Sequence, residues 1–213
     1  MSDGIGFVTS NNANALWSFD LSTGQILDPD GMALTGISSD VFLFANARAA
    51  IPGNFPSSGS NWGIWVADVS TPSDLQAVGL ISLPSTSCIS GQNVVVGADG
   101  VTGYISSFTD DKLYSFSTQT PGLVDPDGVS LPGNPMNIAI AGDRIVVLDS
   151  TTPAIIVVDA SNPGALAVEG SIPLPSSASF LSSNNVLISS DGRTGFVASY
   201  ERVLFSFDIS GMT

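Results

Sequence analysis

Acidic side chains are the main source of chemistry in this sequence, which has 19 Asp and Glu residues, five Lys and Arg residues, one cysteine and no histidine. Two identical turns, Asp28-Pro29-Asp30-Gly31 and Asp125-Pro126-Asp127-Gly128, each hold two closely spaced carboxylates. Because calcium binds several oxygen ligands, Asp28, Asp30, Asp125 and Asp127 are candidates for a calcium site. The same tetrapeptide is typical of a type I turn with proline at its second position, and this structural interpretation is the one we favour. We therefore expect no metal and no cofactor, with calcium as the alternative.

The residue types of the common catalytic sites are almost absent. Without histidine, the chain cannot form a Ser-His-Asp triad, a Cys-His pair or an imidazole metal site. The single cysteine, Cys88, allows no internal disulfide, and no basic residue stands beside it in the sequence to activate its thiol. The only lysine, Lys112, follows Asp110 and Asp111 in a predicted turn. We assign no catalytic residue and expect a protein that is not an enzyme.

The charge of the chain limits the partners that it can bind. A net charge of −14 argues against nucleic acid and against a basic membrane-binding surface. The apolar runs are too short to span a bilayer, and Met1-Ser2-Asp3-Gly4 does not have the pattern of a signal peptide. The low lysine content, with abundant serine, threonine, asparagine and glycine, favours an extracellular or cell-surface protein.

Two kinds of internal repeat organise the chain. The first kind begins with an Asp-Gly pair, at Asp3, Asp99 and Asp191, and continues to an aromatic-Ser-Phe triplet. The three triplets are Trp17-Ser18-Phe19, Tyr114-Ser115-Phe116 and Phe205-Ser206-Phe207. Because strand residues alternate between two faces, the two aromatic residues of each triplet share a face, which we expect to pack between neighbouring sheets.

The second kind of repeat is an apolar strand that ends in Asp-x-Ser-x-Pro. Its copies are Trp65–Pro72 and Ile156–Pro163, and both continue to a Leu-Pro pair. We expect Asp68 and Asp159 to hold the Ser-x-Pro turns through Asx-type hydrogen bonds. Short β-rich runs separated by turn residues fill both kinds of repeat, and no segment has the apolar period of a helix.

Short strands repeated at roughly 40 to 50 residues indicate an all-β fold, a β-propeller built of four-stranded antiparallel blades. A single blade cannot bury both faces of its sheet, whereas stacked blades can. A β-sandwich or a β-solenoid is the alternative. We count five blade-like units in a single domain, 1–213, and their approximate bounds are 1–36, 37–98, 99–142, 143–190 and 191–213.

Both terminal units are expected to be incomplete. The sequence pattern of the first unit lacks an innermost strand, and that of the last unit lacks an outermost one. Open sheet edges can pair with another chain, so a homo-oligomer formed through these edges is one hypothesis. A fragment of a larger propeller is another.

These repeats resemble known propeller families. Ile155–Pro163, followed by Val168–Ser171, resembles the LVIVD repeat, and Trp65–Pro72 is a second copy. The Asp-Gly units resemble YVTN-type repeats. The resemblance implies a YVTN/LVIVD-type β-propeller repeat protein, of a kind found among surface proteins, binding modules and a few enzymes. A metal-dependent hydrolase or lactonase of propeller type is therefore the enzymatic alternative.

An insertion in the first Asp-x-Ser-x-Pro repeat, residues 50–62, is rich in proline, glycine and serine and is predicted to be a loop. Phe55, Asn61 and Trp62 are the candidate partner-binding residues of this loop, since aromatic side chains often dominate binding energy. The alternative is a loop that folds over a blade with Trp62 in the core. The sequence thus predicts a non-enzymatic interaction or scaffold module that binds a protein or glycan partner through loops.

Overall fold

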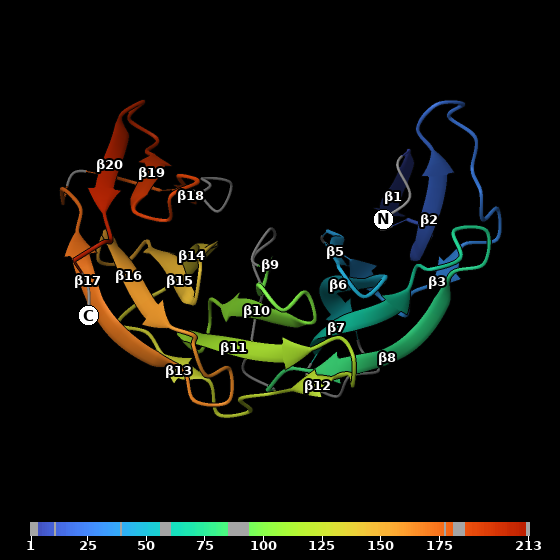
Figure 1. Cartoon of the computed structure of the whole chain (residues 1–213), viewed down its shortest axis with the longest axis horizontal. Helices are drawn as coiled ribbons and strands as arrows, with labels where there is room; N and C mark the ends of the chain where they lie inside the picture. The colour runs from blue at the N-terminus through green and yellow to red at the C-terminus, as the bar shows by residue number, and fades with distance from the viewer. Residues whose placement is uncertain are drawn as a thin grey trace. The chain divides into compact units, whose positions relative to one another are not determined.

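The computed structural model describes most of the chain, and all of its regular secondary structure is β. The described residues are 4–10, 12–38, 40–55, 61–84, 94–176, 178–180 and 186–211, with the backbone alone described for Asn61. In this part of the chain, the strands form five antiparallel sheets of three to five strands each (Figure 1). The all-β prediction is therefore confirmed. Contacts between residues divide the chain into two compact units, Met1–Ser87 with Ser117–Leu123, and Cys88–Phe116 with Val124–Thr213.

The first unit contains one sheet of each repeat type. The first Asp-Gly sheet consists of β1 (Ile5–Ser10), β2 (Ala15–Asp20) and β3 (Met32–Ala33). The first Ser-x-Pro sheet consists of β4 (Ile37–Ser38), β5 (Phe42–Phe44), β6 (Arg48–Phe55), β7 (Asn61–Asp68) and β8 (Gln76–Ser82). The short strand β12 (Gly122–Leu123) also belongs to this unit.

The second unit alternates the two types again. Its second Asp-Gly sheet contains β9 (Val94–Val96), β10 (Thr102–Ser107), β11 (Lys112–Ser117) and β13 (Val129–Ser130). Next comes the second Ser-x-Pro sheet, β14 (Pro135–Ala141), β15 (Arg144–Asp149), β16 (Ala154–Asp159) and β17 (Ala167–Pro173). The third Asp-Gly sheet contains β18 (Val186–Ile188), β19 (Thr194–Ala198) and β20 (Leu204–Asp208).

The Asp-Gly pairs at Asp99 and Asp191 form turns inside a sheet. In the turn between β9 and β10, Gly100 has a φ of 69°, and Asp99 Oδ1 accepts the N–H groups of Val101 and Thr102 at 3.0 and 2.9 Å. The unit bounds predicted at 99 and 191 therefore fall between the first and second strands of a sheet rather than between sheets. The bound at 143 likewise falls between β14 and β15. That residues 1–213 act as a single domain stays a prediction.

Glycine and phenylalanine fit against each other in every Asp-Gly sheet. In the strand register, Gly6 lies opposite Phe19 and Gly195 lies opposite Phe207. Gly103 lies against the ring of Phe116. A Cβ atom at Gly103 would lie 2.2 Å from the ring of Phe116, and one at Gly195 would lie 2.0 Å from the ring of Phe207. The ring thus occupies the space that a side chain would need, which explains why the repeat has glycine here.

Each sheet packs against its neighbour through apolar side chains within its unit. In the second unit, Tyr104 and Leu113 of the Asp-Gly sheet pack with Ile145 and Val147 of the Ser-x-Pro sheet. The opposite side of the same Ser-x-Pro sheet, with Val146, Leu148, Ile155 and Val157, packs against Val197 and Phe207 of the third Asp-Gly sheet. The second Ser-x-Pro sheet is therefore buried on both faces.

The first and last sheets have the fewest strands, as expected from their sequence patterns. In the described residues, β1–β3 and β18–β20 are sheets of three strands, whereas the others have four or five. The first sheet begins with the strand that corresponds to β10, and the last ends with the strand that corresponds to β11.

Candidate interaction surface

The first Asp-Pro-Asp-Gly turn joins two sheets of the first unit. Asp28 is buried, its Oδ1 accepts the N–H of Gly31 at 3.1 Å, and its Oδ2 accepts the N–H of Leu75 at 2.9 Å. Nearby in the same pair of sheets, the hydroxyl of Ser18 donates to the carbonyl of Pro72. One contact runs from the Asp-Gly sheet to the Ser-x-Pro turn and the other to a residue just after that turn, and we call this pair of contacts the sheet junction.

The second unit repeats the sheet junction. The hydroxyl of Ser115 donates to the carbonyl of Pro163 at 2.5 Å. Asp125 Oδ1 accepts the N–H of Gly128 at 3.0 Å, and its Oδ2 accepts the N–H of Leu166 at 3.5 Å. Asp28 and Asp125 are thus fixed by backbone donors in the same way, which supports their interpretation as turn residues.

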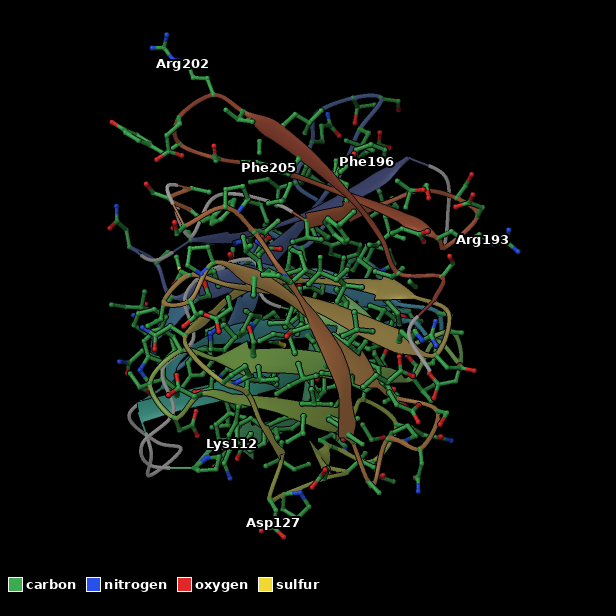
Figure 2. The ribbon with its side chains drawn as sticks, turned by 90° about the vertical axis from the view of Figure 1, so that its left-hand side faces the viewer. Lys112, Asp127, Arg193, Phe196, Arg202 and Phe205 are labelled. Carbon is green, nitrogen blue, oxygen red and sulfur yellow. The ribbon has the colours of Figure 1, made fainter. Side chains whose placement is uncertain are left out.

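The other two calcium candidates are exposed side chains in different units. Asp30 and Asp127 are exposed at their turns, in different units. The backbone carbonyl of Asp127 accepts a hydrogen bond from Lys112 Nζ at 2.6 Å, and the two residues lie together in Figure 2. The described residues contain no group of three or more His, Cys, Asp or Glu side chains in position to bind a metal ion.

Many of the remaining carboxylates cap the ends of strands. The Asx hydrogen bonds predicted for the Ser-x-Pro turns are present, since Asp68 Oδ1 accepts the N–H of Ser70 at 2.9 Å and Asp159 Oδ1 that of Ser161 at 2.8 Å. The hydroxyl and N–H of Ser70, followed by Arg48, lower the pKa of Asp68 to about 2. Much of the acidic character of the chain therefore serves local turn structure.

Asp149, at the end of β15, is a buried carboxylate that the sequence did not single out. Its Oδ1 accepts the N–H groups of Thr151 and Thr152 at 2.8 and 3.3 Å, whereas no hydrogen-bond partner is found for Oδ2. Burial, together with the charge of Asp111, raises the pKa of Asp149. A carboxylate of this kind can hold a proton, but hydrolysis would also need a nucleophile or a paired acid. Its sequence signal, an Asp at the end of an apolar strand, is the same as that of the strand-capping residues.

The insertion is a hairpin, which corrects the predicted loop. β6 and β7 pair from Arg48–Asp68 to Phe55–Asn61, so residues 50–55 and 61–62 are strand, and residues 56–60 lie outside the described residues. The strands lengthen because their apolar residues continue to alternate and pack. Phe55 is buried and contacts Trp65 edge to face, with ring centroids 6.3 Å apart.

The three candidate binding residues therefore differ in their placement. Phe55 belongs to the core of the first unit. Trp62 is partly buried, and the backbone of Asn61 pairs with Phe55. A partner-binding role for Asn61 and Trp62 stays a prediction.

Within the described residues of its unit, one face of the third Asp-Gly sheet is exposed. Strand register places Leu187, Phe196 and Ser206 side by side across β18, β19 and β20, and Ala198 beside Leu204. Leu204 is 67% exposed and Leu187 is 64% exposed, while Ala198 and Ser206 are also exposed. We call these five residues the open face.

Exposed apolar residues continue past the open face into the β19–β20 turn. Tyr200 and Val203 of this turn are 69% and 45% exposed. Figure 2 shows Arg193 and Arg202 extending from opposite ends of the β19–β20 hairpin, with Phe196 between them. Two of the five basic residues of the chain thus flank an apolar surface.

The repeat-related residues of the other Asp-Gly sheets are buried. Leu16 and Leu113, which correspond to Leu204, have no exposed surface. Ser18 and Ser115, which correspond to Ser206, are also fully buried at the sheet junctions. Sequence reasoning missed the open face because the triplets look alike whether or not a neighbouring sheet covers them.

No helix of the described residues has the length and apolar character needed to cross a membrane.

No family model matches the chain, and no curated protein matches it. Solved structures do match. Hydrazine synthase from Kuenenia stuttgartiensis is 16% identical with a TM-score of 0.69, over 91% of this chain and 51% of that chain.

Two further solved structures also match nearly the whole of this chain at low sequence identity. A putative 6-phosphogluconolactonase from Bacteroides uniformis is 15% identical with a TM-score of 0.67, over 98% of this chain and 65% of that one. The β-propeller domain of Cps50 (Swd1) from Myceliophteria thermophila is 13% identical with a TM-score of 0.67, over 97% of this chain and 70% of that one. The chain therefore has a β-propeller fold, and it spans about half the length of the hydrazine synthase chain. At these identities the likeness shows the fold alone.

Proposed function

We propose that this chain is a non-enzymatic interaction module that binds a protein partner through the open face of β18–β20. The observation that carries this proposal is the exposure of Leu187 and Leu204, whose sheet is tightly packed on its other side. Contiguous exposed apolar surface on a folded protein marks a site of interaction. The extracellular or cell-surface setting expected from composition is part of the proposal.

A protein partner fits the surface better than a glycan. The open face is mainly aliphatic, with leucine and alanine beside Phe196. Arg193 and Arg202 stand at its margin, and charged residues around an apolar centre are the usual arrangement of protein interfaces. Tyr200, the most exposed of the large apolar residues, adds an aromatic side chain of the type that often dominates binding energy.

The hydrolase or lactonase alternative has no comparable support. Asp28 and Asp125 accept backbone hydrogen bonds through both carboxylate oxygens. Asp149 is fully buried, so it is not presented to a substrate. The described residues thus offer an exposed apolar surface, and they contain no group of three or more His, Cys, Asp or Glu side chains in position to bind a metal ion.

Site-directed photo-crosslinking tests the proposal. Benzoylphenylalanine replaces Leu204 in the full chain, and the same residue at Leu21, which is 62% exposed in a turn of the first unit, is the control. In an extract of the source cells, we expect a discrete protein adduct from position 204 and none from position 21. No adduct at position 204, or the same adducts at both positions, would contradict the interaction function.

A further inference from the structure

We infer that the partner bound by the open face is a β-sheet of the Ser-x-Pro type, docked so that the hydroxyl of Ser206 donates to the carbonyl of the proline in its Ser-x-Pro turn. This inference rests on the proposed interaction function and specifies the chemistry of the partner. It follows from interfaces that the chain already makes.

The same interface occurs twice between described sheets. In the first unit, Leu16 packs among Ala49, Ile51 and Ala67 of the Ser-x-Pro sheet. In the second unit, Leu113 packs among Ile145, Val147 and Ile156 of the next Ser-x-Pro sheet. In both cases a Ser-x-Pro sheet covers the Asp-Gly sheet.

The polar contact of the interface is also the same in both units. Ser18 donates to the Pro72 carbonyl, and Ser115 donates to the Pro163 carbonyl. A buried hydroxyl needs a hydrogen-bond partner, and the proline carbonyl supplies the acceptor, so the serine and the Ser-x-Pro turn select each other. The interface therefore combines an apolar contact at leucine with one oriented hydrogen bond.

The open face has the residues of that interface in the same order. Leu204 and Ser206 are two residues apart, as are Leu16 and Ser18, and Leu113 and Ser115. A hollow of about 480 Å³ lies beside Ser206, and it is lined by Asp191, Arg193, Thr194, Phe207, Asp208 and Ser210. Ser206 is itself one of the lining residues, and its counterparts Ser18 and Ser115 are the residues that meet the Ser-x-Pro turn in the other two sheets.

A second exposed position supports the same arrangement, in which a Ser-x-Pro sheet covers an Asp-Gly sheet. We call this arrangement the pairing rule. Val8 of β1 is 47% exposed, whereas its repeat-related residue Val197 is 1% exposed, since Val197 packs against the second Ser-x-Pro sheet. Val8 and Leu204 thus both lie in Asp-Gly sheets and correspond to residues that a Ser-x-Pro sheet covers elsewhere.

The pairing rule argues against a second copy of this chain as the occupant. Two copies that met through these faces would bring Asp-Gly sheets together, with no Ser-x-Pro turn to accept the hydrogen bond from Ser206. We therefore assign the open face to a partner that carries its own Ser-x-Pro sheet.

An extended form of the full chain tests this assignment. Residue 213 corresponds by repeat to residue 122, so a copy of residues 123–176, which includes the second Ser-x-Pro sheet, is appended after Thr213. A matched control appends residues 94–130, the second Asp-Gly sheet. Both extended chains carry Leu204→Cys in a Cys88→Ser background. The rate at which the new thiol reacts with a thiol reagent shows whether the appended sheet covers the open face.

We expect the appended Ser-x-Pro sheet to slow labelling of position 204 by about tenfold or more, since only opening would expose the thiol. The Asp-Gly control is expected to leave the rate unchanged. Adding Ser206→Ala to the Ser-x-Pro form should recover about fivefold of the rate, which corresponds to one lost hydrogen bond.

Three results would overturn the inference. These are equal labelling in the two extended chains, no gain of protected backbone amides from the appended Ser-x-Pro sheet, or a protected thiol in the unextended chain, which would show that the face is already covered. A crosslinked partner without a Ser-x-Pro sheet would also overturn it while leaving the interaction function in place. Absence of any crosslinked partner contradicts the function itself.

Discussion

A serine hydroxyl that donates to a proline carbonyl connects one sheet to the next at two places in this chain. Ser18 and Ser115 are both fully buried, and each hydrogen bond joins segments far apart in sequence. Removing a buried donor leaves its acceptor without a partner, which costs about 1–3 kcal/mol. These serines are therefore residues on which the packing of the sheets depends.

Ser18→Ala and Ser115→Ala should each lower the free energy of unfolding by about 1–3 kcal/mol, because each leaves a proline carbonyl unsatisfied. Ser206→Ala should change it by less than about 0.5 kcal/mol, because the side chain is exposed in the free chain. Urea unfolding followed by tryptophan fluorescence measures all three. Equal losses at the three positions would show that Ser206 is already engaged.

Acid should weaken the first unit through Asp68. Its pKa is about 2 in the folded chain against an ordinary value of 3.8, because Ser70 and Arg48 stabilise the carboxylate. A lowered pKa favours folding while the group is ionised, so this stabilisation is complete above about pH 4 and is lost as the pH falls toward about 2.

Asp68→Asn should reduce stability by about 1 kcal/mol at pH 7, and the difference from the natural chain should disappear near pH 2. Unfolding curves at pH 7, 4, 3 and 2 measure it. Asp30→Asn is the matched control, because Asp30 is an exposed aspartate of the same unit. A difference that stays constant down to pH 2 would show that ionisation of Asp68 does not contribute.

At the scale of elements, each Asp-Gly sheet places a phenylalanine ring over a glycine. The Gly103–Phe116 contact leaves no room for a Cβ atom. Gly122, by contrast, has only the carbonyl of Thr120 within 4 Å of such an atom, at 3.8 Å.

Gly103→Ala should therefore destabilise the chain by about 1–3 kcal/mol through overpacking, and Gly122→Ala should have little effect. Combining Gly103→Ala with Phe116→Leu should recover part of the loss, because the smaller side chain makes room for the methyl group. A double-mutant cycle in urea measures the coupling. Additive effects would mean that the ring does not determine the need for glycine.

Local chemistry explains which parts of the sheets the sequence predicts. The Asp-Gly turn at Asp99 and the Asx turn at Asp68 depend on residues within a few positions, so their sequence patterns are sufficient. The hydrogen bond from Leu75 to Asp28 is different, because it forms only after two sheets have packed. Sequence predicted the turn at Asp28 but not its second role.

The insertion shows where a prediction from local composition fails. Proline, glycine and serine between residues 50 and 62 indicate a loop, yet Pro52 and Gly53 lie in β6 and pair with Ile64 and Gly63. Burial of Ile51 and Phe55 in the core of the unit outweighs the local preference. Phe55 therefore belongs to the core of the unit and not to a binding surface. The sequence alone could not distinguish these two placements.

At the scale of the whole molecule, the two sheet types follow one another in a regular order. Asp-Gly and Ser-x-Pro sheets alternate along the described chain, beginning and ending with Asp-Gly sheets. The open face was not predicted, because Leu204 and Ser206 have the same sequence context as their buried counterparts. Only the structure shows that the described sheets leave this third copy uncovered.

The free chain should be monomeric, because its uncovered faces are of the same type and lack the acceptor that Ser206 needs. Light scattering of the purified chain should give the mass of one chain, 21.8 kDa. Addition of calcium should leave this mass unchanged, since backbone donors already engage Asp28 and Asp125. A stable species of twice this mass would favour self-association.

The most direct measurement compares one position across the three Asp-Gly sheets. Leu16→Cys, Leu113→Cys and Leu204→Cys are made separately in a Cys88→Ser background, and the rate of thiol labelling is measured in the folded free chain. We expect position 204 to react about a hundredfold faster than positions 16 and 113, which are reached only when the structure opens. Labelling of position 204 as slow as that of the other two would show that the face is already covered, and would contradict its role as the binding surface.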